Sequence, residues 1–288
     1  MTSDTLKTTS SLLSKQTPPL IMGVLNVTPD SFSDGGKHND QELAVKHALA
    51  MARNGADIID VGGESTRPGA QTIDTDEQLS RVIPVISQLR DELPNDFPIS
   101  IDTTNVEVAR AAVESGVNWL NDISAGEESI EMLELAAQKN FPIVLMHRQG
   151  KSVTMQDAPY YDDVCAEVFS YLLQRSEVAA ERGVTKQHII LDPGIGFGKL
   201  FEHNLAILKN LATLCQYDFP VLLGTSRKRF LSQICNQKDS SQLGVATAAT
   251  TALAIQSGAK ILRVHDIIEN RQAADVAWAI YSAPYVQI

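Results

Sequence analysis

The chain has 288 residues, of which 43% are apolar and 20% are charged, and its 24 basic and 35 acidic side chains give a formal net charge of −11. This composition is that of a globular protein and excludes collagen-like and intrinsically disordered chains. The acidic balance argues against general binding to nucleic acid or to an anionic membrane, because both require a basic surface. The cysteines Cys165, Cys215 and Cys235 form no C-x-x-C pair, so a reducing compartment, the cytoplasm, is expected.

The N-terminal residues 1–17 are rich in Ser and Thr, and Leu12 and Leu13 are their only neighbouring apolar pair. This is too little for the apolar core of a signal peptide. No later stretch approaches the roughly 18 to 20 uninterrupted apolar residues of a membrane span. We therefore expect a flexible tail over 1–17, a single domain over 18–288 and no membrane contact.

From Pro19 onward the chain repeats one pattern, in which a short apolar run ends in polar residues and is followed by a segment of helical period. Strands are predicted at 20–27, 57–61, 98–102, 119–123, 142–146, 189–191, 220–223 and 261–264. Helices are predicted at 41–54, 76–92, 106–115, 130–139, 162–182, 205–211, 244–257 and 267–279. A glycine, in the left-handed conformation that ends many helices, is expected after four of these helices: Gly55, Gly116, Gly183 and Gly258.

Eight alternating strand and helix units over this length predict an α/β fold, a (β/α)8 TIM barrel in a single domain. Runs such as 143–146 are apolar throughout, as in a parallel sheet that is covered on both faces. The main competitor is a doubly wound open sheet. That fold usually carries a glycine-rich turn after its first strand, whereas residues 26–30 read Asn-Val-Thr-Pro-Asp.

In a barrel the chemistry lies at the C-terminal ends of the strands, and all eight predicted ends carry polar residues. Singly, each has an ordinary structural explanation: Asp102 could cap a helix, and His147 could be a core histidine with satisfied nitrogens. Together they exceed what a stable barrel needs. Buried Asp102 and Asp192 must meet hydrogen-bond donors, which the guanidine-like edge of a flat heterocycle supplies, while Asn121 offers both a donor and an acceptor. Positive charge comes from Arg67, Lys228, Arg263 and His265.

Barrels often hold phosphate after their seventh and eighth strands, so the expected ligand has a polar heteroaromatic end and a phosphorylated end. The chain resembles the dihydropteroate synthases in six stretches, namely 26–36, 62–70, 121–123, 192–199, 226–228 and 263–266. The resemblance implies a cytoplasmic, homodimeric, Mg²⁺-dependent barrel of folate synthesis and a sulfonamide target. Such enzymes join (7,8-dihydropterin-6-yl)methyl diphosphate to 4-aminobenzoate, giving 7,8-dihydropteroate and diphosphate.

The resemblance also implies a role for each matched residue. Asn26 would hold Mg²⁺, and Asp34 and Lys228 would act in catalysis, Asp34 by stabilising a pterin cation that forms when the C–O bond breaks first. The pterin would contact Asp102, Asn121, Met146, Asp192, Phe197 and Lys228. The diphosphate would contact Thr66, Arg67, Arg263 and His265. The aminobenzoate would contact Phe32, Ser65, Pro68 and Ser226.

Two other functions fit the same barrel. One is a methyltetrahydrofolate-binding methyltransferase domain, which would have little use for the cationic residues after the last two strands. The other is a catalytically silent pterin-binding protein, which would not need Asn26, Arg67 or His265. A Schiff-base aldolase is disfavoured because no predicted strand contains a lysine. The chain departs from the family pattern at Arg148, Ile195 and Arg229, and the last leaves open which group at 226–229 binds the aminobenzoate carboxylate.

Overall fold

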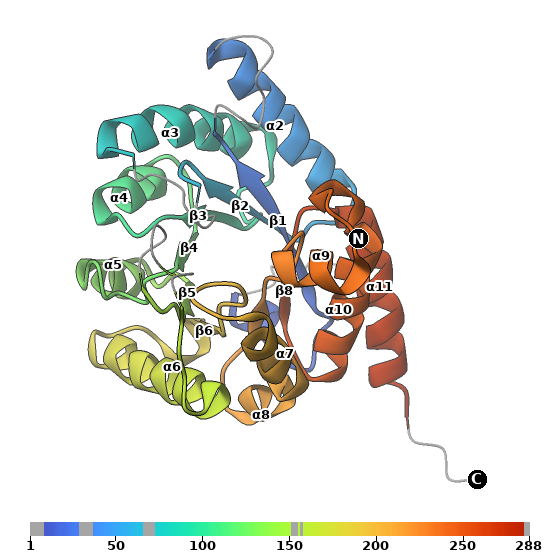
Figure 1. Ribbon diagram of the computed structural model, residues 1–288. Coiled ribbons are helices and arrows are strands. Elements are labelled where there is room, and N and C mark those ends of the chain that lie inside the picture. The colour runs from blue at the N-terminus through green and yellow to red at the C-terminus, as the bar shows by residue number, and fades with distance from the viewer. Residues whose placement is uncertain (1–8, 29–36, 66–72, 151–154, 156–157, 285–288) are drawn as a thin grey trace.

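The fold is a barrel of eight parallel strands with helices around the outside (Figure 1). The structure is a computed structural model and describes residues 9–28, 37–65, 73–150, 155 and 158–284. The strands, in the spatial order β6-β5-β4-β3-β2-β1-β8-β7, are β1 (Leu20–Asn26), β2 (Ile58–Gly62), β3 (Ile99–Asp102), β4 (Trp119–Asp122), β5 (Ile143–Met146), β6 (Ile189–Asp192), β7 (Leu222–Leu223) and β8 (Ile261–Val264). The two ends of this sheet meet through a bridge between Leu191 and Val221. The predicted TIM barrel is confirmed.

The helices in the described part of the chain are α1 (Thr9–Leu12), α2 (Lys37–Arg53), α3 (Thr75–Glu92), α4 (Val106–Glu114), α5 (Glu131–Lys139), α6 (Val164–Glu181), α7 (Phe201–Lys209), α8 (Leu211–Gln216), α9 (Arg229–Cys235), α10 (Gly244–Gln256) and α11 (Ile267–Tyr281). None of them is both long and apolar enough to cross a membrane. The four helix-ending glycines have φ values of 102°, 111°, 92° and 97°, as predicted. Short helices α1, α8 and α9 were not predicted.

The inner face of the barrel changes from apolar to polar along the strands, because successive side chains of a strand alternate between the two faces. Outward residues such as Ile59 and Val61 of β2 belong to the large core beneath the helices. Inward residues at the N-terminal ends form a second apolar cluster: Leu20, Met22, Ile58, Trp119, Val144, Ile190, Leu222 and Ile261. Two residues further along β2 and β8, the inward positions are Asp60 and Arg263. The polar inner layer therefore rests on an apolar floor.

The N-terminal segment closes the barrel below this floor. Leu13 is 4% exposed and joins the inner apolar cluster, while the Lys15 ammonium donates to the carbonyls of Cys215 and Tyr217. Lys260 donates to the carbonyls of Thr17 and Pro18. The expectation of a flexible tail up to residue 17 is therefore wrong from Leu13 onward, because these residues pack against parts of the chain some 200 positions away.

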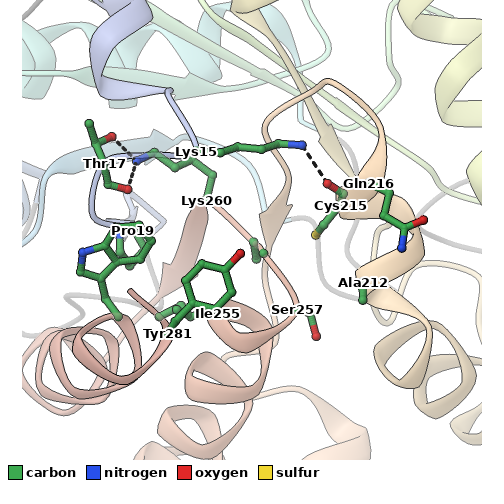
Figure 2. Close-up of a pocket in the computed structure, with 13 residues that line it drawn as sticks. Lys15, Thr17, Pro19, Ala212, Cys215, Gln216, Ile255, Ser257, Lys260 and Tyr281 are labelled. Carbon is green, nitrogen blue, oxygen red and sulfur yellow. Dashed lines mark hydrogen bonds between the residues drawn. The ribbon is translucent and has the colours of Figure 1, made fainter. Parts of the chain in front are cut away.

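A cavity of about 260 Å³ lies beside this segment, between it and the ends of α8, α10 and α11 (Figure 2). Lys15 and Lys260 line it, but both ammonium groups already donate to main-chain carbonyls. Burial raises the pKa of the third reactive group there, the Cys215 thiol, to about 12, so that thiol stays protonated. The cavity is at the opposite end of the barrel from the polar inner layer.

Candidate active site

The centre of the polar layer is a guanidinium between two carboxylates. Arg263 of β8 donates through Nε to Asp60 Oδ2 at 2.7 Å and through Nη2 to Asp102 Oδ2 at 2.6 Å. Asn121 of β4 also donates to Asp60 Oδ2, at 3.0 Å from Nδ2. An ionised carboxylate only accepts hydrogen bonds, so Asp60 fixes the Asn121 amide with its Nδ2 toward β2. Four strands thus place these side chains in one network.

Asp60 is a site residue that the sequence analysis missed. It stands among three apolar residues in β2 and is fully buried. Burying a lone Asp inside an apolar strand costs free energy unless its carboxylate meets hydrogen-bond donors. An Asp in such a strand could therefore have identified Asp60 as a candidate site residue. The donor that pairs with Asp60 is Arg263, which is 203 positions away in the sequence. Only the folded barrel brings the two residues together.

Burial sets the ionisation of this network. It raises the pKa of Asp102 to about 7, although the charge of Arg263 opposes the rise, and the neighbouring Asp60 adds to it. Burial also acts to lower the pKa of Arg263, but the charges of Asp60 and Asp102 outweigh it, so the guanidinium stays protonated. The buried Oδ1 atoms of Asp60 and Asp102 and the Ser100 hydroxyl have no hydrogen-bond partner among the described residues. Such acceptors favour a ligand that brings N–H donors.

The second half of the site comes from β6 and its following loop. Asp192, 7% exposed, accepts a hydrogen bond from the Gly194 amide at 2.8 Å. Burial raises the pKa of Asp192, against the opposing charge of Lys228. Burial also lowers the pKa of Lys228 to about 8, against the opposing charge of Asp192. Lys228 donates to the Ile195 carbonyl and lies 4.7 Å from the centre of the Phe197 ring. Met146 pairs with Asp192 in the strand register.

Glycine is required where this loop passes the end of β5. Gly194 has a φ of 64°, and a Cβ there would lie 1.9 Å from the His147 carbonyl oxygen. Gly198 has a φ of 62°, and a Cβ there would lie 2.3 Å from the Gln149 carbonyl oxygen. The glycines therefore allow two main chains to touch, which a side chain at either position would prevent.

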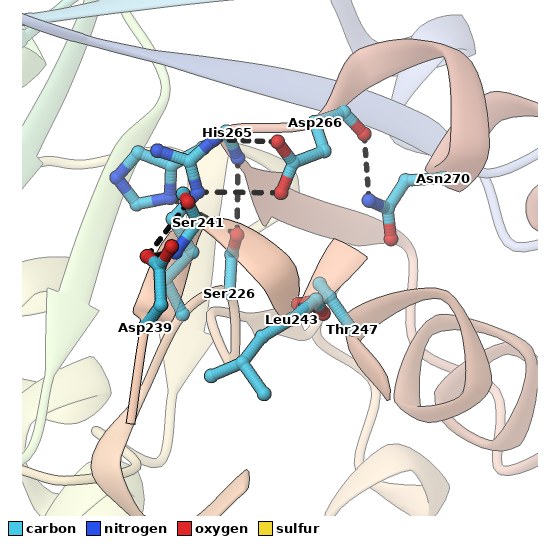
Figure 3. A network of polar contacts seen from close by, with 9 residues as sticks. Ser226, Asp239, Ser241, Leu243, Thr247, His265, Asp266 and Asn270 are labelled. Atoms are coloured by element: carbon cyan, nitrogen blue, oxygen red, sulfur yellow. Dashed lines mark hydrogen bonds and ion pairs between the residues drawn. The ribbon is translucent and has the colours of Figure 1, made fainter. Parts of the chain in front are cut away.

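Ser226 and His265 meet at the mouth of the barrel after β7 and β8 (Figure 3). The Ser226 hydroxyl accepts from the His265 amide at 3.1 Å and lies 3.0 Å from its ring Nδ1. The next residues of both loops form an ion pair, with Arg227 Nη2 at 2.5 Å from Asp266 Oδ1. The Asp266 carbonyl in turn accepts from Asn270 Nδ2 in α11 at 2.6 Å. These contacts bind the two loops together.

Asn26 ends β1, the strand that pairs directly with β8. It pairs in register with Gly62, which pairs with Asp102. A Cβ at Gly62 would lie 3.7 Å from Asn26 Oδ1 and 3.9 Å from Asp102 Oδ2. The absence of a side chain at Gly62 thus leaves both oxygens facing one space. No cluster of three or more His, Cys, Asp or Glu residues suited to a metal ion occurs among the residues that the structure describes.

The structure brings ten of the predicted site residues to the C-terminal end of the barrel: Asn26, Asp102, Asn121, Met146, Asp192, Phe197, Ser226, Lys228, Arg263 and His265. Ser65 follows β2 and is half-buried. The predictions at Phe32, Asp34, Thr66, Arg67 and Pro68 fall outside the described residues. Arg148, a departure from the family pattern, pairs with Glu128.

Comparisons with known proteins agree on one family. A family model described as "Pterin binding enzyme" matches residues 22–265. The chain is 46% identical over 261 residues to a dihydropteroate synthase of Synechocystis sp., covering 91% of this chain and 90% of the relative. It is similar to the Xanthomonas albilineans dihydropteroate synthase solved with 4-aminobenzoic acid, with a TM-score of 0.86, 43% identity and coverage of 93% and 94%. The Yersinia pestis enzyme in a sulfonamide drug complex also gives a TM-score of 0.86, at 40% identity and coverage of 92% and 95%.

Proposed function

The chain belongs to the pterin-binding enzymes and, among them, to the dihydropteroate synthases, and we propose that its barrel mouth joins (7,8-dihydropterin-6-yl)methyl diphosphate to 4-aminobenzoate. The products are 7,8-dihydropteroate and diphosphate. The observation that carries the proposal is the pair of buried carboxylates, Asp102 and Asp192, held beside Arg263 and Lys228. A methyltransferase domain or a silent binding protein on the same barrel is not what the named relatives indicate.

The pterin fits the deepest part of the polar layer. Its aminopyrimidine edge carries N–H donors, and the unpartnered Asp102 Oδ1 is an acceptor that no described residue satisfies. Asp192 is a second buried acceptor beside the Lys228 ammonium. Asp60 holds the Asn121 amide in one orientation by accepting one hydrogen of its Nδ2. The Asn121 side-chain oxygen and the second Nδ2 hydrogen are then available to hydrogen-bond the edge of the pterin ring. Met146 and Phe197 would pack against the ring faces.

The diphosphate end points toward the mouth. His265 lies there, beside Ser226, and Thr66 and Arg67 of the second loop are proposed to join it. Arg263 is differently placed, because its Nε and Nη2 already donate to Asp60 and Asp102. Its remaining donors are available to the substrate, so we propose that it contacts both the pterin and the diphosphate.

Magnesium fits this site as an ion that the protein and the diphosphate of the substrate would bind jointly. The Asn26 side-chain oxygen faces the open space above Gly62 and is a hard neutral donor, as Mg²⁺ prefers. Without a carboxylate cluster among the described residues, the remaining ligands would be diphosphate oxygens and water. When bound, the ion would neutralise charge on the leaving diphosphate.

The reaction proposed is a dissociative substitution. The bond between the pterin methylene carbon and the diphosphate oxygen breaks, and the electron pair leaves with the diphosphate. The resulting pterin cation is stabilised by the ionised Asp102 and Asp192, and the neutral amine of 4-aminobenzoate then bonds to the methylene carbon and loses a proton. An arylamine is neutral at pH 7 and needs no strong base, so the proposed step requires no activated nucleophile from the protein.

The aminobenzoate is proposed to bind at the rim, near Ser226, Ser65, Phe32 and Pro68. Ser226 precedes helix α9, which begins at Arg229. Because the Yersinia pestis relative was solved with a sulfonamide, we propose that sulfonamides compete with 4-aminobenzoate here. We also propose that the enzyme works in the cytoplasm, which suits its three free cysteines.

We propose that the enzyme is a homodimer that pairs through α10 and α11, which lie side by side (Figure 1). Large apolar side chains that are at least half exposed gather on these helices: Val245, Leu253, Ile268, Val276 and Ile280. Exposed apolar side chains gathered on one pair of neighbouring helices are typical of a protein–protein interaction surface. A second copy of the same face would cover it, as two-fold symmetric dimers commonly do.

Diphosphate release tests the proposed function. With both substrates and Mg²⁺ present, the purified enzyme should release diphosphate and form 7,8-dihydropteroate in equal amount. Asp102→Asn should reduce the rate by at least about a hundredfold, because the amide cannot replace the ionised acceptor. No release of diphosphate with both substrates and Mg²⁺ present, or release without formation of 7,8-dihydropteroate, would contradict the proposal.

A further inference from the structure

A second buried lysine, Lys199, lies behind the loop that follows β6. It is 3% exposed, and its Nζ lies 2.9 Å from His147 Nδ1, 3.1 Å from the Phe197 carbonyl oxygen and 3.4 Å from the His147 carbonyl oxygen. Burial lowers the pKa of Lys199 well below its usual value, although the charge of Asp192 opposes this. Burying an amine is costly unless it is hydrogen-bonded, and these three contacts offset that cost.

The three contacts join two segments of main chain. His147 follows β5, whereas Phe197 lies in the loop after β6. The amine has hydrogens for both carbonyls whether or not it is charged, and the His147 ring holds the third position. Burial and the charge of Lys199 lower the pKa of His147 to about 3, so the ring is neutral. Lys199 therefore bridges the two loops over a wide pH range.

Lys228 contacts the same loop after β6 from its other side. That side chain donates to the Ile195 carbonyl and lies over the Phe197 ring. The loop begins at Asp192 and is anchored further by Asn204, whose Oδ1 accepts from the Gly196 amide at 2.7 Å. A shift of the Phe197 main chain would therefore be passed to Lys228 and from it to Asp192.

We propose that Lys199 is a positioning residue for the pterin: it holds the Phe197 main chain against the end of β5 and so fixes the places of Phe197, Lys228 and Asp192. The inference rests on the proposed function, because the loop matters only if it contacts the pterin. It assigns no contact between Lys199 and any substrate. Removal of Lys199 should therefore weaken pterin binding and leave aminobenzoate binding nearly unchanged.

Lys260 provides a matched control at the other end of the barrel. It is 2% exposed, and its ammonium also makes three hydrogen bonds, to the carbonyl and hydroxyl oxygens of Thr17 and to the Pro18 carbonyl. Lys199→Met and Lys260→Met therefore remove the same chemistry from two buried sites. Both substitutions should lower stability against chemical denaturation. Only Lys199 contacts the loop that is proposed to bind the pterin.

The test measures binding of 7,8-dihydropteroate by calorimetry and the KM for each substrate. Lys199→Met should raise the dissociation constant of dihydropteroate and the KM for the pterin diphosphate by about tenfold or more, while the aminobenzoate KM changes by less than about twofold. Lys260→Met should leave all three near the wild-type values. Lys199→Gln keeps a donor on a shorter side chain and should fall between wild type and Lys199→Met.

Two results would overturn the inference: unchanged pterin binding in a folded Lys199→Met, or an equal loss in Lys260→Met. If Lys199→Met does not fold, Lys199→Gln decides by the same criteria, with unchanged pterin binding counting against the inference. Failure of the proposed function gives a different result, because the wild-type enzyme itself would then bind no dihydropteroate.

Discussion

The Asp60 carboxylate lies 2.7 Å from Arg263 Nε and accepts a second hydrogen bond from Asn121, so one oxygen orients two residues of the proposed pterin pocket. Asp60 is fully buried, and through Oδ2 it acts on the site by way of these two partners. Its position explains why a charged residue occupies the middle of an apolar strand.

Replacing Asp60 with Asn should reduce kcat/KM for the pterin diphosphate by about a hundredfold and cost roughly 3 kcal/mol of stability, because it leaves part of the Arg263 charge unpaired in the interior. Steady-state kinetics and urea denaturation measure the two effects. Asp57→Asn is the control: Asp57 pairs with Arg271 near the N-terminal end of β2, and its loss should leave the kinetics unchanged. Equal kinetics for the two variants would contradict the role given to Asp60.

The pH dependence of kcat/KM for the pterin diphosphate should be a narrow bell. Burial raises the pKa of Asp102 to about 7, so its carboxylate becomes the ionised acceptor only as the pH rises through that value. Burial lowers the pKa of Lys228 to about 8, so its positive charge is lost above that pH. Lys228→Arg should move the alkaline limb upward and leave the acid limb in place. A flat profile between about pH 6 and 9 would be inconsistent with these ionisations.

The role of Asn26 can be separated from that of the other site residues through the metal requirement. Asn26→Ala should raise the Mg²⁺ concentration for half-maximal rate by about tenfold or more, while saturating Mg²⁺ restores much of the rate. Asn26→Asp, which retains an oxygen donor, should show a smaller shift. Identical Mg²⁺ titrations for wild type and Asn26→Ala would remove this residue from the metal site.

Asp34 lies outside the described residues, and its role remains a prediction from the sequence. If its carboxylate stabilises the pterin cation, Asp34→Asn should lower kcat by about a hundredfold or more while changing the KM for the pterin diphosphate little. Single-turnover measurements with saturating substrates test this directly. An unchanged rate would show that Asp34 does not act in the chemical step.

The dimer proposal predicts a change of mass. Leu253→Glu combined with Val276→Glu should convert the enzyme from a dimer to a 31.3 kDa monomer in sedimentation experiments, because two charges cannot be buried in the pairing face. Leu43→Glu, on α2, alters another exposed apolar residue and should leave the dimer intact. A wild-type monomer at micromolar concentration would contradict the proposal.

Much of the barrel could be predicted because its signals are local. An apolar run followed by polar residues marks a strand and its C-terminal end, and Asp102, Asn121 and Asp192 were placed correctly by that pattern alone. Asp60 could not be found in this way, because its partner Arg263 is distant in the sequence. Leu13 was assigned to a tail for the same reason, since only the closed barrel offers it an apolar surface.

The buried N-terminal segment also constrains the order in which the protein is completed during synthesis. Residues 13–18 leave the ribosome well before their hydrogen-bond partners Cys215, Tyr217 and Lys260 are made. At about 5 to 20 residues per second, the segment waits on the order of ten seconds or more for them. Closure of the barrel floor therefore has to follow the synthesis of Lys260, and protection of residues 13–18 from proteolysis would report that the chain has been made at least that far.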